Sequence, residues 1–497
     1  MKIFNPLICA VLGAMLGYYG IAPFRETRWA LPVIIVMLAL LAASFSFFRI
    51  LAFLNSDHYS SMCRSRCAVF LAAGFILGIA SLCTAARDGI VRLGLTDREI
   101  TGISGILLDD PRISSSGRGF ATLKLNSAAG HGGLRVSARG KVTVFFPDEA
   151  LPRLKEFGRR SAVFVEGSFA EVRMGRGRLF RAKTTHIVKG AGQLDRLRTT
   201  LRQNLVGIFE QRTWGGLALA LLLGVKDNLD NELAAQYRDA GCSYILALSG
   251  MHLAIVSSII AFLLKRPLGL KPAAALGAVF VLIYIYLVGP QPSLVRAGIS
   301  YLIGALAIFL ALKTNAIHIV ALSFLVQLIF DPASGLTISF MLSYLALAGI
   351  LIAGEPIGAL LRGRLPALIA EPLSASLGAF VATMAITIFY FGNLRIAGIF
   401  AGLVMVPLTT LFMIGSIIFL VLSIIPPLAH AVTPLFDSVF LLLYRILETT
   451  VSTAANAPAI PVINKPIFVI LSIVLPFALI FLCAKRIKAR NTIGTFD

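Results

Sequence analysis

Residues 397–424, AGIFAGLVMVPLTTLFMIGSIIFLVLSI, form an apolar run without a charged side chain. A helix of about 20 apolar residues crosses the hydrocarbon layer of a membrane, so this run is long enough to span it. The run 272–289, PAAALGAVFVLIYIYLVG, is similar. Of the 497 residues, 57% are hydrophobic and only 14% are charged, whereas soluble domains carry about 25% charged residues. The sequence therefore excludes an ordinary soluble protein and predicts a polytopic α-helical membrane protein.

The apolar runs predict about twelve spans along the chain. They begin near residues 5, 30, 68, 242, 272, 293, 317, 336, 367, 397, 431 and 467. The run 317–330 is short and the run 397–424 is long, so either one can be re-entrant or broken. Residues 5–22 follow Lys2 as in a signal sequence but lack a small-x-small cleavage site, and we expect a retained span.

Basic residues in the short loops predict the orientation. Twelve spans place four groups of Lys and Arg on one side of the membrane: Arg49, Arg64 and Arg66; Lys265, Arg266 and Lys271; Arg362 and Arg364; and Lys485, Arg486, Lys488 and Arg490. Short cytoplasmic loops are enriched in these residues, so both termini are expected in the cytoplasm. The predicted order is a membrane region (1–86), an external β domain (87–190), a linker with interfacial helices (191–241), a larger membrane domain (242–484) and a basic tail (485–497).

Alternating segments rich in β-branched and aromatic residues predict five strands in the external segment. These are Ile100–Leu108, Phe120–Asn126, Leu134–Phe146 with a bulge at Gly140, Ala162–Phe169 and Leu179–Val188. Five strands in about 90 residues fit a small OB-like barrel, a frequent platform for single-stranded nucleic acid. Residues 190–212 then predict a polar helix that leads through Trp214 to the short apolar run 217–223, an interfacial connection between barrel and membrane.

Positive charge concentrates in the external segment. The formal net charge is +21, and residues 87–212 hold 23 Lys and Arg against 12 Asp and Glu, which suits a polyanion or anionic lipid. Candidate nucleic-acid contacts are Arg135, Arg139, Lys141, Arg173, Arg176, Arg178 and Arg181. Phenylalanines that stack bases can interleave with them, but a small barrel also needs aromatics in its core. A merely solvated basic face or a lipid contact stays an alternative.

Several classes of site are absent from the sequence. The six cysteines lie within or beside apolar segments, which excludes a disulfide-stapled ectodomain. The six histidines are never closer than 55 positions, and no GxxxxGK[ST] loop occurs. Clustered zinc hydrolase motifs and a P-loop ATPase are therefore excluded, and we expect no metal and no cofactor.

The stretch 241–254, GCSYILALSGMHLA, is the best candidate for a functional element within the membrane. If it is helical from Cys242, His252 lies about 15 Å along the helix, near the middle of the bilayer. An ionisable residue there is costly and by default lines a hydrated interior. Ser249 shares its face, and Gly250 allows close approach or a break. Hydrogen bonding to neighbouring helices is the alternative of equal weight.

Other polar residues of the spans are weaker candidates. Arg296 lies near the outer start of its span, where it either snorkels to the surface or lines a path and attracts phosphates. Ser343 supplies a hydroxyl, for which helix contact is the commoner use. Arg445 and Glu448 lie three residues apart, and an ion pair between them is expected.

At these residues the chain resembles a known family. The run 220–260, ALLLGVKDNLDNELAAQYRDAGCSYILALSGMHLAIVSSII, resembles the opening of the competence domain of the ComEC family, and LSGMH is its most specific part. Three further runs resemble later segments in the same order: LVRAGISYLIGALAIFL (294–310), DPASGLTISFMLSYLALAGIL (331–351) and FYFGNLRIAGIFAGLVMVPLTT (389–410). The external barrel matches the family's OB-like domain.

The resemblance implies a bacterial inner-membrane channel that passes single-stranded DNA to the cytoplasm, with an external DNA receptor and a cytoplasmic ATPase as partners besides membrane lipids. It also implies that Ser249, Gly250, His252 and Arg296 line the path without a catalytic role. Ser343 is a further candidate for lining the path. Many members carry a C-terminal metallo-β-lactamase-like domain, but the sequence ends soon after the last expected span, so we expect no nuclease here. A transporter or flippase of a small anionic or lipidic substrate and a non-translocating DNA-binding anchor are the alternatives.

Overall fold

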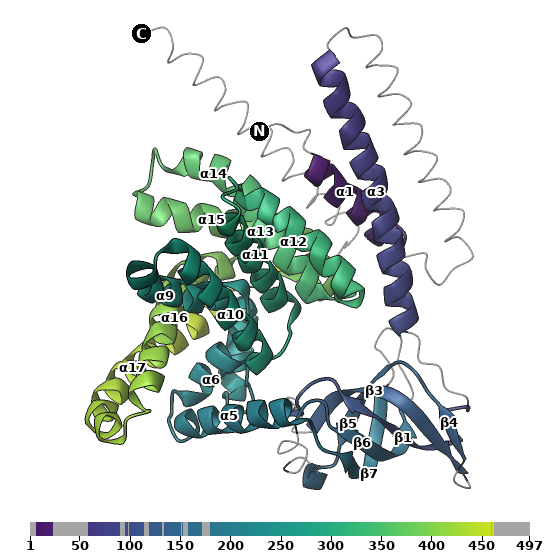
Figure 1. The fold of residues 1–497 in the computed structure, drawn as a ribbon. Coiled ribbons are helices and arrows are strands. Elements are labelled where there is room, and N and C mark those ends of the chain that lie inside the picture. Colours follow the sequence, from purple (N-terminus) through teal and green to yellow (C-terminus); the bar gives the residue numbers. More distant parts are fainter. Residues whose placement is uncertain are drawn as a thin grey trace, which may run out of the picture.

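The computed structural model describes residues 6–22, 58–89, 95–97, 99–113, 119–131, 134–150, 152, 158–170, 179–458 and 460–461. It has two parts, a helical part and a β-barrel, and helix α5 lies between them (Figure 1). The helices are α1 (Pro6–Tyr19), α3 (His58–Gly89), α5 (Gln193–Glu210), α6 (Gly215–Leu223), α7 (Asn231–Asp239), α8 (Ser243–Leu246), α9 (Gly250–Leu268), α10 (Leu270–Val288), α11 (Pro292–Phe309), α12 (Ala316–Phe330), α13 (Ile338–Ile352), α14 (Gly354–Leu361), α15 (Ala367–Phe391), α16 (Ala397–Leu422) and α17 (Pro426–Ala455).

The helical part agrees with the predicted apolar runs. Six of the described helices are long and apolar enough to cross a membrane, or seven if the bent pair α13 and α14 counts as one span. Three shorter apolar helices also coincide with predicted runs: Pro6–Tyr19, Val69–Ala85 and Ala316–Phe330. The chain is therefore a multi-pass membrane protein. The predicted runs near residues 30 and 467 lie outside the described residues, so the described helices do not establish a total of twelve.

The one bent pair among the described apolar helices lies at a different position from the two breaks that the sequence suggested. The short run forms one unbroken helix, α12, and the long run forms α16, which continues through Pro407. A bend of 45° occurs instead between α13 and α14. A proline is tolerated inside a membrane helix because neighbouring groups satisfy the freed carbonyl, which explains why Pro407 does not end α16.

Five strands close the barrel. They are β1 (Ile100–Leu107), β3 (Gly119–Gly130), β5 (Lys141–Phe146), β6 (Ala162–Phe169) and β7 (Leu179–Lys189), with β2 (Arg112–Ile113) and β4 (Arg135–Ser137) paired to β3. The order around the barrel is β1-β3-β5-β7-β6 and back to β1, and only the β5–β7 pair is parallel among the described strands. Alternate side chains of β3 and β5 point inward, as half-buried strands require.

The expected single strand 134–146 is divided in two. The short strand β4 ends at Ser137 and β5 begins at Lys141. Gly140 lies between them with a φ of 125°, a conformation that glycine adopts more readily than other residues. The expected bulge at Gly140 is therefore a break that redirects the chain.

The linker contains helices of different character. In α6 all nine residues are buried, because a helix that is apolar on every side is stable only inside a core. The indole of Trp214 stacks on Phe440 with ring centroids 4.2 Å apart. Residues 217–223 thus lie in the core of the helical part, which differs from the expected interfacial position. The polar helix α5 connects this core to the barrel (Figure 1).

Glycine sets the spacing of α1 and α3. A Cβ added at Gly74 would lie 2.0 Å from the carbonyl oxygen of Ala10, and one at Gly13 would lie 2.0 Å from that of Leu71. The two helices therefore touch backbone to backbone, as small residues permit in membranes. The hydroxyl of Tyr19 at the end of α1 donates to the carbonyl of Gly335 at 2.9 Å, which ties this pair to the rest of the helical part.

Candidate functional site

The LSGMH stretch forms a helix start rather than the middle of a helix. The short helix α8 ends at Leu246, Ala247 has an extended ψ of 126°, and α9 begins at Gly250. His252 consequently lies in the first turn of α9. The expectation that His252 lies about 15 Å along a continuous helix from Cys242 is wrong, because the backbone turns between residues 247 and 249.

Ser249 and His252 cap this helix together. The backbone N–H of Ser249 donates to Nδ1 of His252 at 2.9 Å, and Oγ of Ser249 accepts from the N–H of Met251 at 3.3 Å. The two side chains are also in contact, with Oγ 3.2 Å from Nδ1. This is a capping box with histidine at its third position, and such an arrangement satisfies amide groups that a helix start leaves free.

The capping box fixes the tautomer of His252. A backbone N–H can only donate, so Nδ1 must accept, and the proton of the neutral ring is on Nε2. The residue is fully buried, and Nε2 has no hydrogen-bond partner among the described residues. His252 thus presents a buried donor without an acceptor, a feature that calls for an explanation in a native structure.

Arg296 lies against the same helix start. A Cβ added at Gly250 would be 2.7 Å from Nη2 of Arg296, so the absence of a side chain at position 250 makes room for the guanidinium. Arg296 is 9% exposed and does not snorkel to the surface. Its guanidinium carbon lies 5.7 Å from the ring centroid of Tyr344, within the range of a cation–π contact.

Hydrogen bonds that link α13, α12 and α11 hold the Tyr344 ring in place. The hydroxyl of Tyr344 donates to Oε1 of Gln327 at 2.9 Å, and Nε2 of Gln327 donates to the carbonyl of Pro292 at 3.0 Å. Ser343, the adjacent candidate, is half-buried. The structure therefore brings Ser249, Gly250, His252 and Arg296 together, while Tyr344, which the sequence analysis did not single out as a ligand-facing residue, is the member of α13 that contacts Arg296.

The barrel presents an outer face that mixes cations with aromatic rings. Phe120 of β3 pairs with Phe145 of β5, which pairs with Arg181 of β7. Both phenylalanines are half-buried and Arg181 is exposed, whereas Phe146 and Phe180 point into the core. Outward and core positions thus alternate along these strands, as the pleat of a strand requires.

Other basic residues extend this outer face. Lys124 and Lys141 are exposed and directly opposite one another on β3 and β5, an arrangement that is unfavourable without an anion nearby. Arg139 is exposed, and the guanidinium of Arg135 lies 5.7 Å from the ring centroid of Phe164. The candidates Arg173, Arg176 and Arg178 lie outside the described residues.

Comparisons with known proteins identify the family. The family profile described as Competence protein matches residues 221–487, more than half of the chain. The chain belongs to the Competence protein family. It is also similar to ComE operon protein 3 of Bacillus subtilis (strain 168), with 29% identity over 200 residues that cover 39% of this chain and 25% of that protein. The chain thus matches about a quarter of that relative's length. No solved structure matches the chain.

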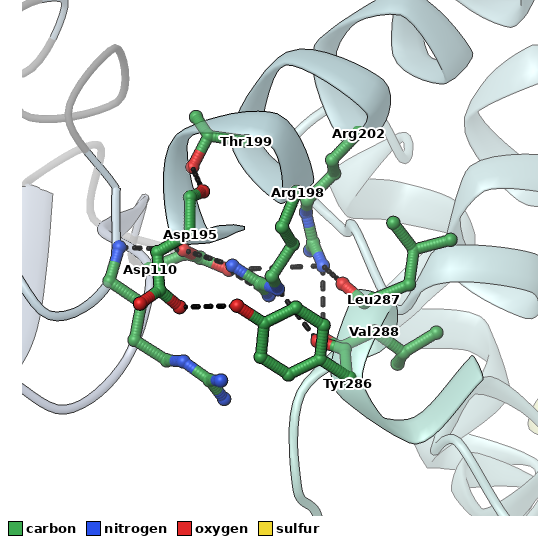
Figure 2. A network of polar contacts seen from close by, with 9 residues as sticks. Asp110, Asp195, Arg198, Thr199, Arg202, Tyr286, Leu287 and Val288 are labelled. Atoms are coloured by element: carbon green, nitrogen blue, oxygen red, sulfur yellow. Dashed lines mark hydrogen bonds and ion pairs between the residues drawn. The ribbon is translucent and has the colours of Figure 1, made fainter. Parts of the chain in front are cut away.

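In this Competence protein a polar network joins the barrel to the helical part (Figure 2). Arg198 of α5 donates from Nη1 and Nη2 to the two carboxylate oxygens of Asp110, at 3.0 and 2.7 Å. Its Nε donates to the carbonyl of Tyr286 at the end of α10, at 2.7 Å. Arg202 donates to the carbonyl of Val288 at 2.9 Å. One arginine therefore contacts both a barrel turn and a membrane helix.

Further contacts reinforce this network. The hydroxyl of Tyr286 donates to Oδ1 of Asp195 at 2.8 Å, and the guanidinium of Arg159 lies 5.4 Å from the Tyr286 ring centroid. Burial raises the pKa of Asp110, but the hydrogen bonds and charge of Arg198 outweigh it and hold that pKa below its ordinary value. No spacing along the chain could pair Asp110 with Arg198 at the sequence level.

The remaining expectation concerns the pair on α17. Nη1 of Arg445 lies 2.9 Å from Oε2 of Glu448, which confirms the expected ion pair. Within the described ranges, no three His, Cys, Asp or Glu side chains gather into a group that could hold a metal ion.

Proposed function

We propose that this protein is a channel that passes a single strand of DNA through the bacterial inner membrane. Membership of the Competence protein family implies a role in DNA uptake, and the channel function is our extension of it. The observation that carries the proposal is the row Phe120, Phe145 and Arg181 on the outer face of the barrel. Aromatic rings that stack bases beside cations that contact phosphates are the usual means of binding single strands without sequence preference.

The barrel topology supports the same proposal. Counted along the chain, its five strands follow the order 1-2-3-5-4 around the barrel with a parallel pair between the third and fifth. We assign this arrangement to the OB-like class, whose second and third strands form the ligand-binding face. Here these strands are β3 and β5, which carry Phe120, Lys124, Lys141 and Phe145. The basic aromatic face therefore coincides with the surface that such barrels use.

The topology that we propose places this barrel on the external side of the inner membrane. We propose about twelve spans with both termini in the cytoplasm, so that residues 87–241 are external. The strand would contact the barrel first and then pass the start of α9, where His252 and Arg296 supply buried polar groups. We propose no catalytic role for this chain. An external DNA receptor, a cytoplasmic ATPase and membrane lipids are its proposed partners.

Uptake of labelled DNA tests the proposal. Cells carry the native gene, a deletion, the double variant Phe145→Ala/Arg181→Gln, or the control Arg445→Gln, whose ion pair lies on α17 far along the chain. Surface-bound and cytoplasmic DNA are scored separately. The channel proposal expects the deletion to abolish cytoplasmic DNA and the double variant to reduce it at least tenfold, while the control matches the native gene. Unchanged cytoplasmic DNA in the deletion strain would falsify the channel, and a loss of surface-bound DNA alone would favour a binding anchor.

A further inference from the structure

Arg296 is a buried cation without a counterion in the described part of the chain. Its side chain is 9% exposed, its Nε is buried without a hydrogen-bond partner, and none of the described ion pairs includes it. The aromatic ring of Tyr344 faces its guanidinium in a cation–π contact. A charge removed from water is costly unless it is paired, so the described residues around Arg296 do not supply the anion that its charge requires.

The neighbouring start of α9 adds positive charge and free hydrogen-bond donors beside Arg296. Arg296 lies beside Gly250, the first residue of the 19-residue helix α9, and the start of a helix carries a partial positive charge. Nε2–H of His252 in the same first turn is a second buried donor without an acceptor. Ser300, one turn after Arg296 on α11, also has a buried hydroxyl without a partner. Within the described residues, the Arg296 charge and these two donors of α9 and α11 thus lack an acceptor.

We propose that Arg296 and His252 form a binding site for a phosphodiester group at the start of α9. A phosphodiester has one negative charge shared by two oxygens, which matches one guanidinium and one neutral N–H donor. The planar guanidinium suits phosphate oxygens geometrically, and helix starts favour such anions. This site rests on the proposed function if the phosphodiester is that of DNA. A lipid headgroup carries the same chemistry.

The arrangement also explains why the site has a single cation. Each phosphate of a moving strand must leave as well as bind, and a path needs sites that are favourable without being traps. A neutral histidine adds a hydrogen bond but no second positive charge. The capping box holds Nδ1 as an acceptor, which keeps the proton on Nε2, where it can be donated.

Thermal unfolding of the full chain in a phosphate-free maltoside detergent tests the site. The probes are dimethyl phosphate, a single-stranded thymidine oligonucleotide, the same oligonucleotide with an uncharged methylphosphonate backbone, and short-chain phosphatidylglycerol. The variants are Arg296→Gln, Arg296→Lys and the control Arg445→Gln. We expect dimethyl phosphate and the charged oligonucleotide to raise the melting temperature of the native protein and of the control, with binding at least tenfold weaker in Arg296→Gln and largely restored in Arg296→Lys. Without ligand, Arg296→Gln should melt at the native temperature or above it, because an unpaired charge is removed.

The outcomes distinguish failure of the proposed phosphodiester site from failure of the proposed channel function. If dimethyl phosphate stabilises the native protein and Arg296→Gln equally, the site is overturned, whatever DNA uptake shows. If it stabilises only proteins with a cation at position 296 while the gene deletion leaves DNA uptake unchanged, the site stands and the channel is wrong. If phosphatidylglycerol stabilises the protein and the charged oligonucleotide does not, the ligand is a lipid headgroup and the assignment to DNA is overturned.

Discussion

Arg198 and Asp110 lie 88 positions apart in the sequence and form a bidentate ion pair, in which the arginine side chain is only 1% exposed. Asp110 belongs to a turn of the barrel, and Arg198 also contacts the end of α10 through the carbonyl of Tyr286. The pair therefore fixes the barrel relative to the membrane helices. If the barrel binds a single strand as proposed, this contact would hold the strand in a defined position relative to those helices.

Replacing Asp110 by asparagine should weaken this connection. Arg198 would remain buried without a counterion, and the loss of one partner of a buried pair costs about 3 to 5 kcal/mol. We expect about the lower value, because the Asp110 side chain is 21% exposed. The melting temperature of the full chain and the hydrogen exchange of the amides of residues 287–289 and 291 measure it. The control Glu448→Gln breaks an exposed pair on α17 and should change neither. Unchanged exchange in Asp110→Asn would contradict the role of the pair.

The same carboxylate should make the connection sensitive to acid. The pKa of Asp110 is lower in the folded protein than its ordinary value, so its stabilising contribution is complete above the pKa of the unfolded chain and is lost as pH falls through the folded pKa. The difference in melting temperature between the native protein and Asp110→Asn should therefore be constant from about pH 7 to about pH 5 and shrink below about pH 4. A difference that persists unchanged at about pH 2 would contradict this assignment.

The outer face of the barrel should dominate binding of single strands. Phe145→Ala should weaken oligonucleotide binding by the full chain by about 1 to 3 kcal/mol, the range for loss of one stacked base. Arg181→Gln should reduce the slope of log affinity against log salt by about 0.7, as expected for one phosphate contact with a single strand. Fluorescence anisotropy at several salt concentrations measures both. The control Arg445→Gln should leave the slope unchanged, and a Phe145→Ala protein with native affinity would exclude stacking on this ring.

Local patterns in the sequence were sufficient to predict most elements of the fold. Apolar length located the membrane helices, and alternation located the strand Ala162–Phe169 with the bounds that the structure has. Periodicity could not show that Phe120 and Phe145 point outward while Phe146 points inward. Alternation separates the two faces of a strand but does not tell which of them packs on the core. It also could not place the break before Gly250, since a capping box and a continuous apolar helix fit the same residues until Ser249 and His252 are seen in contact.

The contacts between distant elements could not be predicted. The pairing of Asp110 with Arg198 and that of Arg296 with the Tyr344 ring depend on tertiary packing. A charged residue in an apolar run signals function in general, which drew attention to Arg296. The absence of its counterion becomes visible only when its surroundings are known.

The close packing of α1 and α3 gives a prediction for the N-terminal helices. In Gly74→Leu the new Cβ would lie 2.0 Å from the carbonyl oxygen of Ala10, so the helices must separate. We expect a loss of at least about 3 kcal/mol, as for other severe overpacking, and a lower melting temperature of the full chain. The control Ala73→Leu changes an exposed neighbour on the same helix and should have little effect. Equal melting temperatures for the two variants would contradict backbone contact at Gly74.

The capping box allows the structural and functional roles of His252 to be separated. In His252→Gln the amide oxygen can accept from the N–H of Ser249, because glutamine is a natural third residue of a capping box, so the melting temperature should stay near that of the native protein. His252→Leu removes the acceptor and should cost about 1 kcal/mol, the typical value for a lost cap. The glutamine amide nitrogen can also donate in place of Nε2–H. If Nε2–H contacts the strand, His252→Gln should therefore retain cytoplasmic DNA, whereas His252→Leu, which lacks a donor, should reduce it. Native uptake in His252→Leu would instead assign His252 to capping alone.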